Sequence, residues 1–292
     1  MGAAMKVLVT GVGGQLGYDV VRELEARGHM AIGVNHQTMD ITDAAVVDRV
    51  IRENAPDAVI HCAAYTAVDA AEDDEEQCSR VNVDGTRNIA EVCKSLDIKM
   101  IYISTDYVFS GQGERPWEPG DEREPQNVYG RTKCEGEFVV QNLLEKYFIV
   151  RVTWIYGING KNFVKTMLKL SETHDTLRVV DDQIGSPTYT LDLAVLLANM
   201  VETEKYGIYH ATNEGTCSWH EFACAIFEEA GLGEKITVLP VSSKEYGAKA
   251  PRPYNSRMSN EKLVKNGFHR LPTWQDALKR YLEVLKMDSG VR

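Results

Sequence analysis

The sequence has little of what would mark a membrane, secreted or nucleic-acid-binding protein. No apolar run approaches the ~18–20 residues that cross a bilayer. The first residues, MGAAMKVLVTG, lack the apolar core of a secretory signal because the run breaks at Gly11. The net charge of −11 lacks the cationic surplus that binding to DNA or RNA requires. We therefore expect no membrane association and no nucleic-acid partner.

Paired cysteines are also missing. The chain has six cysteines, but none stands in a C-x-x-C pair or at the spacing of a metal finger. Most have apolar or helical neighbours, as is typical of cysteines that serve as small hydrophobic residues. Unpaired cysteines favour a reducing compartment, so we predict a cytoplasmic protein.

What the first half does have is an alternation of short apolar runs with helical patterns. The apolar runs cover residues 6–11, 30–35, 57–64, 99–105 and 147–154. Helical periodicity separates them, for example over residues 78–96. Apolar strands that alternate with helices predict an α/β fold with a doubly wound, Rossmann-type parallel sheet covered on both faces. Ligands of such sheets bind at the carboxyl ends of the strands.

The second half follows a looser pattern. Helical patterns cover residues 162–173, 191–203, 218–230 and 273–287, with short strands near 177–180, 207–211 and 236–240. Residues 242–260, rich in Pro, Ser, Asn and Arg, are expected to form a long loop. We predict a dinucleotide-binding domain over residues 1–155 and a smaller C-terminal substrate lobe formed mainly by residues 156–292. Some of the later segments are expected to return to the sheet.

Three glycines follow the first predicted strand and open the first helix. Gly11, Gly14 and Gly17 stand at the G-x-x-G-x-x-G spacing. Glycines there allow a tight turn and a close approach of the backbone to a pyrophosphate at the helix N-terminus. The position between a strand and a helix predicts dinucleotide binding rather than a plain turn.

The second predicted strand ends without the residue that usually selects a cofactor. It ends at Asn35, where NAD-binding proteins commonly carry an acid, and no Lys or Arg lies between Arg27 and Arg49. An amide can donate a hydrogen bond to a ribose hydroxyl without repelling a 2′-phosphate. We therefore expect both NADH and NADPH to work. Asp40, just after this strand, either reaches the adenine or caps the following helix.

Polar and small residues follow the third and fourth predicted strands. The third ends in HCAAY, whose small residues suit a backbone that runs under a ribose or packs closely on a helix. Asn82 stands inside the next predicted helix, where its amide competes with the backbone and favours a special hydrogen-bonding role. Ser104, Thr105 and Asp106 end the fourth strand, so we expect them to face the ligand crevice.

A tyrosine and a lysine stand four residues apart in VYGRTKCEGE. On a helix, Tyr129 and Lys133 share one face. The pKa of an isolated phenol is about 10, and a nearby ammonium is expected to lower it toward neutrality. The Thr105 hydroxyl could help to polarise a substrate oxygen. With a nicotinamide cofactor, these groups predict reversible hydride transfer between a carbonyl and an alcohol.

Two arginines flank a short segment in the predicted C-terminal loop. Arg252 and Arg257 enclose PYNS in a Pro-interrupted stretch. A planar guanidinium can bind a diphosphate with two hydrogen bonds. We expect one or both to bind the diphosphate of a sugar nucleotide; the alternative is a solvated loop charge.

At this point the sequence resembles the extended short-chain dehydrogenase/reductase superfamily, and more closely the dTDP-4-dehydrorhamnose reductase family. The matching blocks extend over essentially the whole chain, and several are specific to this family. They are GGQLG, HCAAYTAVDAAE, STDYVFSG, VYGRTKCEGE, RVTWIYG, DQIGSPTYTLDLA and RPYNSRMSNEKL.

The resemblance implies NAD(P)H-dependent reduction of the C4 ketone of dTDP-4-dehydro-L-rhamnose to dTDP-L-rhamnose, an activated sugar of cell-surface polysaccharides. Tyr129 would donate the proton to O4, and Lys133 would also hold the nicotinamide ribose. Thr105 and Asp106 would contact the sugar, and Trp154 would pack against it. The residues implied near the cofactor are Gly14, Gln15 and Leu16 at the pyrophosphate, Asp40 and Ile41 at the adenine, and Ala63, Ala64 and Tyr65 at the nicotinamide half.

The resemblance leaves the metal and the assembly open. Some members of the family bind Mg²⁺ at a dimer contact through glutamates, whereas this chain has Asp19 and Asp192 at the corresponding positions and no clear third ligand. Mg²⁺ and a homodimer are therefore in doubt. Three alternatives remain: another nucleotide-sugar 4-ketoreductase, an epimerase, or a non-catalytic regulatory subunit that resembles that of methionine adenosyltransferase.

Overall fold

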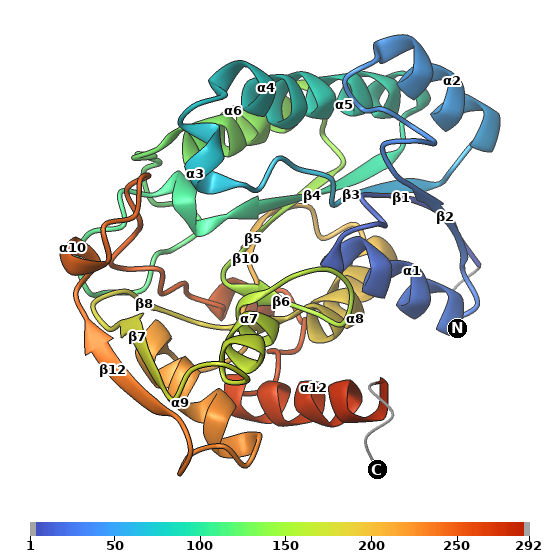
Figure 1. The fold of residues 1–292 in the computed structure, drawn as a ribbon. Helices are drawn as coiled ribbons and strands as arrows, with labels where there is room; N and C mark the ends of the chain where they lie inside the picture. Colours follow the sequence, from blue (N-terminus) through green and yellow to red (C-terminus); the bar gives the residue numbers. More distant parts are fainter. Residues whose placement is uncertain (1–3, 289–292) are drawn as a thin grey trace.

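The computed structural model describes residues 4–288. The outer ends of the two predicted domains, residues 1–3 and 289–292, lie outside this range. A central sheet with helices above and below it forms one part of the molecule, and a smaller lobe lies beneath the sheet in the view of Figure 1. The ligand-binding edge of the sheet faces this lobe.

The central sheet has six strands, and every pair of neighbours is parallel. Its strands are β1 (Lys6–Thr10), β2 (Met30–Val34), β3 (Ala58–His61), β4 (Lys99–Thr105), β5 (Tyr147–Val152) and β10 (Gly207–His210). They are ordered β10-β5-β4-β3-β1-β2. The chain steps outward in opposite directions from β1, to β2 on one side and β3 on the other. A crevice forms at such a reversal, at the carboxyl ends of the strands.

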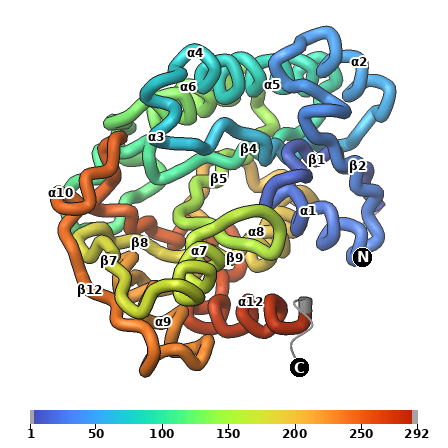
Figure 2. Tube along the Cα trace, in the orientation of Figure 1, coloured from blue at the N-terminus to red at the C-terminus, as the bar shows by residue number. Residues whose placement is uncertain are grey.

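Helices cover both faces of the sheet, as the apolar strands require. One face packs against α1 (Gln15–Ala26) and α8 (Thr190–Val201), and the other packs against α2 (Ala44–Asn54), α5 (Gly85–Leu96) and α6 (Val128–Leu143). Figure 2 shows these two helical layers on opposite sides of the strands. The predicted doubly wound fold is confirmed.

The helix predicted over residues 78–96 is three segments in the structure. These are α4 (Glu75–Ser79), a π-helical turn η1 (Arg80–Asp84) and α5. A π-turn is rare and commonly stands at functional sites. The nearby short elements are α3 (Val68–Ala71) and the 3₁₀ turn η2 (Asp106–Val108).

The smaller lobe packs around a second apolar cluster. Its helices are α7 (Phe163–Leu170), α9 (Trp219–Glu229) and α12 (Trp274–Asp288). Strand pairs connect them: β7 (Thr176–Val180) with β12 (Thr237–Val241), β6 (Ile155–Tyr156) with β9 (Thr188–Tyr189), and β8 (Ile184–Gly185) with β11 (Cys217–Ser218). Between these segments the chain returns to the sheet through α8 and β10.

The predicted long loop is not wholly irregular. It contains the short helix α10 (Ser243–Tyr246), which begins with a capping box between Ser242 and Glu245, and α11 (Glu261–Lys265) follows it. Within residues 4–288, none of the helices combines the length and the apolar character that crossing a bilayer demands.

Candidate active site

A cavity of about 970 Å³ opens at the carboxyl ends of the strands. Residues from the glycine turn, the loops after β2 and β3, the end of β4 and helix α6 line it. Of the predicted site residues, those on its wall are Gly11, Gly14, Gln15, Leu16, Gly17, Asn35, Asp40, Ile41, Ala63, Ala64, Tyr65, Thr105, Asp106, Tyr129, Lys133 and Trp154. The structure thus brings the predicted cofactor and catalytic groups to one cavity.

The glycine turn has the geometry that a pyrophosphate requires. Gly11 has a φ of +71°, and a Cβ atom there would lie 2.8 Å from the Ala63 nitrogen. A Cβ atom at Gly17 would lie 2.5 Å from the Gly11 oxygen, so helix α1 packs closely on the turn. Gly14, the N-cap of α1, provides no capping side chain, which leaves the first N–H groups of the helix for phosphate oxygens. The residues present fit a dinucleotide.

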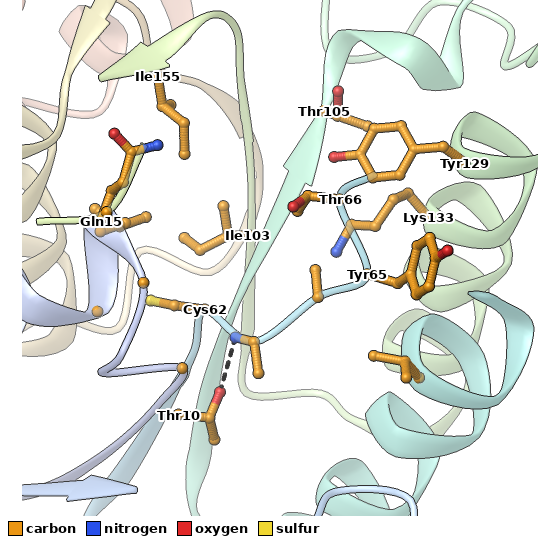
Figure 3. Close-up of a pocket in the computed structure, with 18 of the residues that line it drawn as sticks. Thr10, Gln15, Cys62, Tyr65, Thr66, Ile103, Thr105, Tyr129, Lys133 and Ile155 are labelled. Atoms are coloured by element: carbon orange, nitrogen blue, oxygen red, sulfur yellow. Dashed lines mark hydrogen bonds between the residues drawn. The ribbon is translucent and has the colours of Figure 1, made fainter. Parts of the chain in front are cut away.

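The loop after β3 is held at both ends by polar side chains. Thr10 Oγ1 accepts a hydrogen bond from the Ala63 N–H at 3.0 Å, which is the dashed line in Figure 3. Asn82 accepts from the Tyr65 N–H at 2.8 Å and donates to the Tyr65 carbonyl at 3.2 Å. This pair of bonds is the special role that an interior Asn predicts. The segment from Cys62 to Tyr65 therefore has a fixed course along the cavity.

The end of the cavity after β2 combines an amide, a carboxylate and a cation. Asn35 Oδ1 accepts hydrogen bonds from the Gln37 and Thr38 N–H groups, so its amide nitrogen is the group that can donate to a ligand. Asp40 closes its own turn with Thr42 and does not cap a helix, because Asp43 is the N-cap of α2. The hydrogen bond from the Thr42 backbone lowers the pKa of Asp40.

Arg80 also lines this end of the cavity, and its charge adds to the lowering of the pKa of Asp40. It stands on the π-turn η1, far from β2 in the sequence. The cation that sequence reasoning did not find beside the second strand therefore comes from a different element.

Tyr129, Lys133 and Thr105 converge on the other part of the cavity. Figure 3 shows the Tyr129 ring beside Thr105, with the Lys133 side chain extending below it into the cavity. Both residues of the Tyr–Lys pair lie on α6, which begins at the N-cap Asn127, whose side chain accepts from the Gly130 N–H at 2.7 Å. Thr105 ends β4 and is buried. The predicted juxtaposition of strand end and helix face is therefore present.

The electrostatic balance at Tyr129 differs from the expectation. Burial raises the pKa of Tyr129 above its ordinary value, and the hydrogen bond with Thr105 offsets only part of this. Burial also lowers the pKa of Lys133 to about 7. The pKa of Tyr129 is therefore raised, and not lowered by Lys133 as predicted. The reason is that removing both groups from water penalises the charged form of each.

Asp106 and Trp154 line the same cavity as Tyr129, Lys133 and Thr105. Burial raises the pKa of Asp106 to about 6, against hydrogen bonds from Ser256 and Thr105. Trp154 has a φ of +45°, an unusual backbone conformation for so large a residue. Its ring stacks on Trp219 with the centroids 3.7 Å apart, and both rings line the cavity. The pair provides a flat aromatic surface on the cavity wall.

The two predicted arginines have different places. Arg252 donates to Asp69 at 2.7 Å and lines a second cavity of about 410 Å³, which shares Tyr107 with the first. Arg257 donates to Asn255 at 3.0 Å and lines neither of these two cavities. The structure therefore brings Arg252, and not Arg257, to the edge of the site.

Comparison with known proteins identifies relatives that match nearly the whole chain. A family model described as the RmlD substrate binding domain matches residues 5–287. A dTDP-4-dehydrorhamnose reductase of Mycobacterium tuberculosis is 40% identical over 283 residues, which are 95% of this chain and 92% of the relative. The chain belongs to the dTDP-4-dehydrorhamnose reductase family.

Two further known proteins are similar to this chain, one compared in sequence and one in structure. The spore coat polysaccharide biosynthesis protein SpsK of Bacillus subtilis is 42% identical, with 95% of this chain and 97% of the relative covered. A crystal structure of the Bacillus anthracis dTDP-4-dehydrorhamnose reductase in complex with NADP superimposes with a TM-score of 0.93. It is 42% identical, and the match covers 96% of this chain and 99% of that one.

The Mg²⁺ site that occurs in some members of the reductase family does not fit the residues present here. Asp19 accepts a hydrogen bond from Thr190, and Asp192 accepts two hydrogen bonds from Arg280, at 2.9 and 2.8 Å. A guanidinium thus occupies the carboxylate that would bind the ion. Among residues 4–288, no group of three or more His, Cys, Asp or Glu side chains is arranged to hold a metal.

Three residues that line the cavity were not predicted from the sequence. Thr10 ends β1 directly before the glycine turn, and this position could have revealed it. Arg80 and Trp219 carry no comparable signal, because they reach the cavity from the π-turn and from the start of α9.

Proposed function

We infer that the chain reduces the C4 ketone of dTDP-4-dehydro-L-rhamnose to dTDP-L-rhamnose with NADH or NADPH. The observation that carries this inference is the meeting of Tyr129, Lys133 and Thr105 with the glycine turn in one cavity. Membership of the reductase family over nearly the whole chain supports the substrate.

Tyr129 is proposed as the proton donor to O4. The nicotinamide, when bound, supplies a hydride to C4. The carbonyl oxygen then takes a proton, and the Tyr129 phenol is positioned to give it. Because burial raises the pKa of Tyr129, the hydroxyl stays protonated at neutral pH, which is the form that a proton donor needs. In this proposal Thr105 turns its hydroxyl from Asp106 to donate a second hydrogen bond to the same oxygen, and Lys133 binds the nicotinamide ribose.

The cofactor is proposed to extend from the catalytic groups to the loop after β2. Gly11, Gly14, Gln15, Leu16 and Gly17 would face the pyrophosphate at the N-terminus of α1. Ala63, Ala64 and Tyr65 would run beside the nicotinamide half. Asn35, Asp40 and Ile41 would surround the adenosine.

The sugar nucleotide is proposed to lie across the mouth of the site. Asp106 and Trp154 would contact the sugar, and Trp219 extends the same stacked surface. The Arg252 guanidinium would bind the diphosphate, and the second cavity, next to Arg252, would then receive the nucleoside. We expect this guanidinium to exchange its bond with Asp69 for phosphate oxygens.

The assay that tests the proposal supplies dTDP-4-dehydro-L-rhamnose with each reduced nicotinamide and follows the loss of cofactor absorbance. The product is identified by NMR as the sugar reduced at C4. No oxidation of the cofactor with this substrate, together with turnover of a different nucleotide 4-ketosugar, would contradict the assigned substrate and favour another 4-ketoreductase.

Two other functions make distinct predictions. An epimerase keeps its cofactor through the reaction, so purified protein would carry bound NAD. A regulatory subunit would bind a synthetase and would not turn over the ketone. The Tyr–Lys pair and Thr105 favour the reductase over the regulatory subunit, and membership of the reductase family favours it over the epimerase. We propose a cytoplasmic enzyme, and a homodimer would be tested by its mass in solution.

A further inference from the structure

A carboxylate is buried on α6, one helical turn after Lys133. Glu137 lies on α6 with none of its side chain exposed. Arg151 Nε donates to its Oε1 at 2.8 Å and Arg151 Nη2 to its Oε2 at 2.7 Å. Arg123 donates to Oε2 at 3.0 Å, and Ser104 Oγ donates to Oε1 at 2.6 Å. The two carboxylate oxygens thus share four hydrogen bonds.

The three partner residues connect Glu137 to the elements that carry the site. Ser104 immediately precedes Thr105 on β4, and Arg151 lies on β5, the next strand in the sheet. Lys133 stands four residues before Glu137, on the same face of α6. A buried ion pair of this kind is weak evidence for stability, since apolar side chains of similar volume often stabilise as well. Its position suggests a second purpose.

The surroundings of the Lys133 ammonium contain few groups that can balance its charge. Its ammonium is almost fully buried and lies 4.0 Å from the centroid of the Tyr102 ring. Within residues 4–288, no carboxylate lies within 4.0 Å of it. The titratable groups near it on the neighbouring elements are Tyr129 (Figure 3) and Glu137 on α6, Cys78 on α4, His61 on β3, Cys62 just after β3, and Tyr102 on β4.

Of these groups, Glu137 is the one that carries a full negative charge near neutrality. Burial alone would raise the pKa of Glu137, but Arg151, Ser104 and Arg123 outweigh it and leave the pKa below its ordinary value. Burial lowers the pKa of Lys133 to about 7, and Glu137 is the largest influence that opposes this lowering. Cys62 and Cys78 act in the same direction more weakly, and burial raises the pKa of both thiols.

We propose that Glu137 is a positioning residue for the reduction, which keeps the Lys133 side chain in its ammonium form through its anchored carboxylate. This inference rests on the role given to Lys133 in the proposed function. Arg151, Arg123 and Ser104 hold the carboxylate in place, so its charge acts on Lys133 from a constant position. A neutral Lys133 would have one N–H donor fewer to offer a ribose, and none of its hydrogen bonds would be charge-assisted.

The direct test follows the titration of Lys133 by NMR in protein labelled with ¹³C-lysine. The Lys133 signal is assigned by its absence in Lys133→Met. In Glu137→Gln, which keeps the size of the side chain and removes its charge, we expect the midpoint of the Lys133 titration to fall by about one pH unit or more. The high-pH limb of kcat/KM should move down by the same amount. The matched control is Glu135→Gln, a partly exposed carboxylate on the same helix, with an unchanged midpoint.

A second variant covers the case in which Glu137→Gln does not fold, because it leaves Arg151 without its counter-charge. Glu137→Leu combined with Arg151→Met removes the pair together, a change that buried ion pairs often tolerate. It should show the same fall in the Lys133 midpoint. An unchanged midpoint in either folded variant would overturn the proposal. A shifted midpoint in a protein that does not reduce the sugar would contradict the proposed function instead.

Discussion

At the scale of single residues, the state of the proton on Tyr129 decides what the site can do. Replacing Tyr129 by Phe removes the proposed donor and keeps the ring that lies edge-on to Tyr107. We expect the fold to persist and kcat to fall by roughly 10²–10⁴-fold, the range for a positioned acid. Steady-state kinetics and circular dichroism check this. Near wild-type turnover in the Phe variant would remove Tyr129 from the proposed mechanism.

Tyr156 provides the matched control for that variant. Its ring is buried among aromatic side chains of the smaller lobe, and in the described part of the chain its hydroxyl has no hydrogen-bond partner. Tyr156→Phe should therefore leave kcat unchanged and should not lower the thermal midpoint, since it removes an unsatisfied buried group.

Arg252 is the second residue with a distinct expected effect. Arg252→Gln should raise KM for the sugar nucleotide by roughly 10–100-fold, the loss of one charge-assisted contact of ~1.5–3 kcal/mol. The effect on kcat should be small, because the diphosphate lies away from C4. Arg257→Gln is the matched comparison, since Arg257 lines neither described cavity. Equal effects of the two substitutions would show that the guanidinium at Arg252 has no special place.

At the scale of elements, the π-turn η1 gives the cofactor site a cation that the second strand lacks. Arg80 stands at the start of this turn and lines the cavity near Asn35 and Asp40. We expect Arg80→Gln to lower kcat/KM for NADPH by about tenfold and to leave NADH nearly unaffected, because only NADPH carries a 2′-phosphate. Arg87→Gln, on α5, is the control. A parallel loss with both cofactors would place Arg80 elsewhere in binding.

The wild-type chain is still expected to accept both cofactors, with kcat/KM values within roughly tenfold of each other, or about 1.4 kcal/mol. Asn35 presents an amide rather than a carboxylate, and the charge of Arg80 offsets that of Asp40 at this end of the cavity. Steady-state kinetics with each cofactor measure the ratio. A preference beyond a hundredfold in either direction would contradict a permissive pocket.

At the scale of the whole molecule, two buried histidines couple stability to pH. Burial lowers the pKa of His61 to about 3 and that of His210 well below its ordinary value. In the unfolded chain both titrate near 6.5. Between pH 4.5 and 6 the unfolded state therefore binds protons that the folded state does not, so each histidine makes stability fall as the pH falls.

His61→Gln tests this coupling. The variant should reduce the slope of unfolding free energy against pH by about 1.4 kcal/mol per pH unit over pH 4.5–6. Asp106, whose pKa is raised to about 6, opposes the histidines in this window and acts equally in both proteins. Urea unfolding at several pH values measures the slope. His269→Gln, at an exposed position, is the control, and an equal slope in wild type and His61→Gln would contradict the assignment.

The sequence by itself determined the features that arise from short-range order. Alternating apolar runs predicted the parallel sheet, and the spacings of Gly11, Gly14 and Gly17 and of Tyr129 and Lys133 predicted a turn and a helix face. Such patterns depend on the backbone geometry of a few neighbouring residues. The same locality explains why the helix over residues 78–96 was predicted as continuous, since a π-turn differs from an α-helix by one shifted hydrogen bond.

Only the tertiary structure decided which distant residues meet and what burial does to their charges. Arg80 on η1 lines the same end of the cavity as Asp40, Trp219 stacks on Trp154 from α9, and Arg252 reaches a cavity where Arg257 does not. The tertiary structure also decided that the pKa of Tyr129 is raised rather than lowered. A pKa sums desolvation and charge over every element packed around a group, and the spacing of two residues along one helix gives only one contribution to that sum.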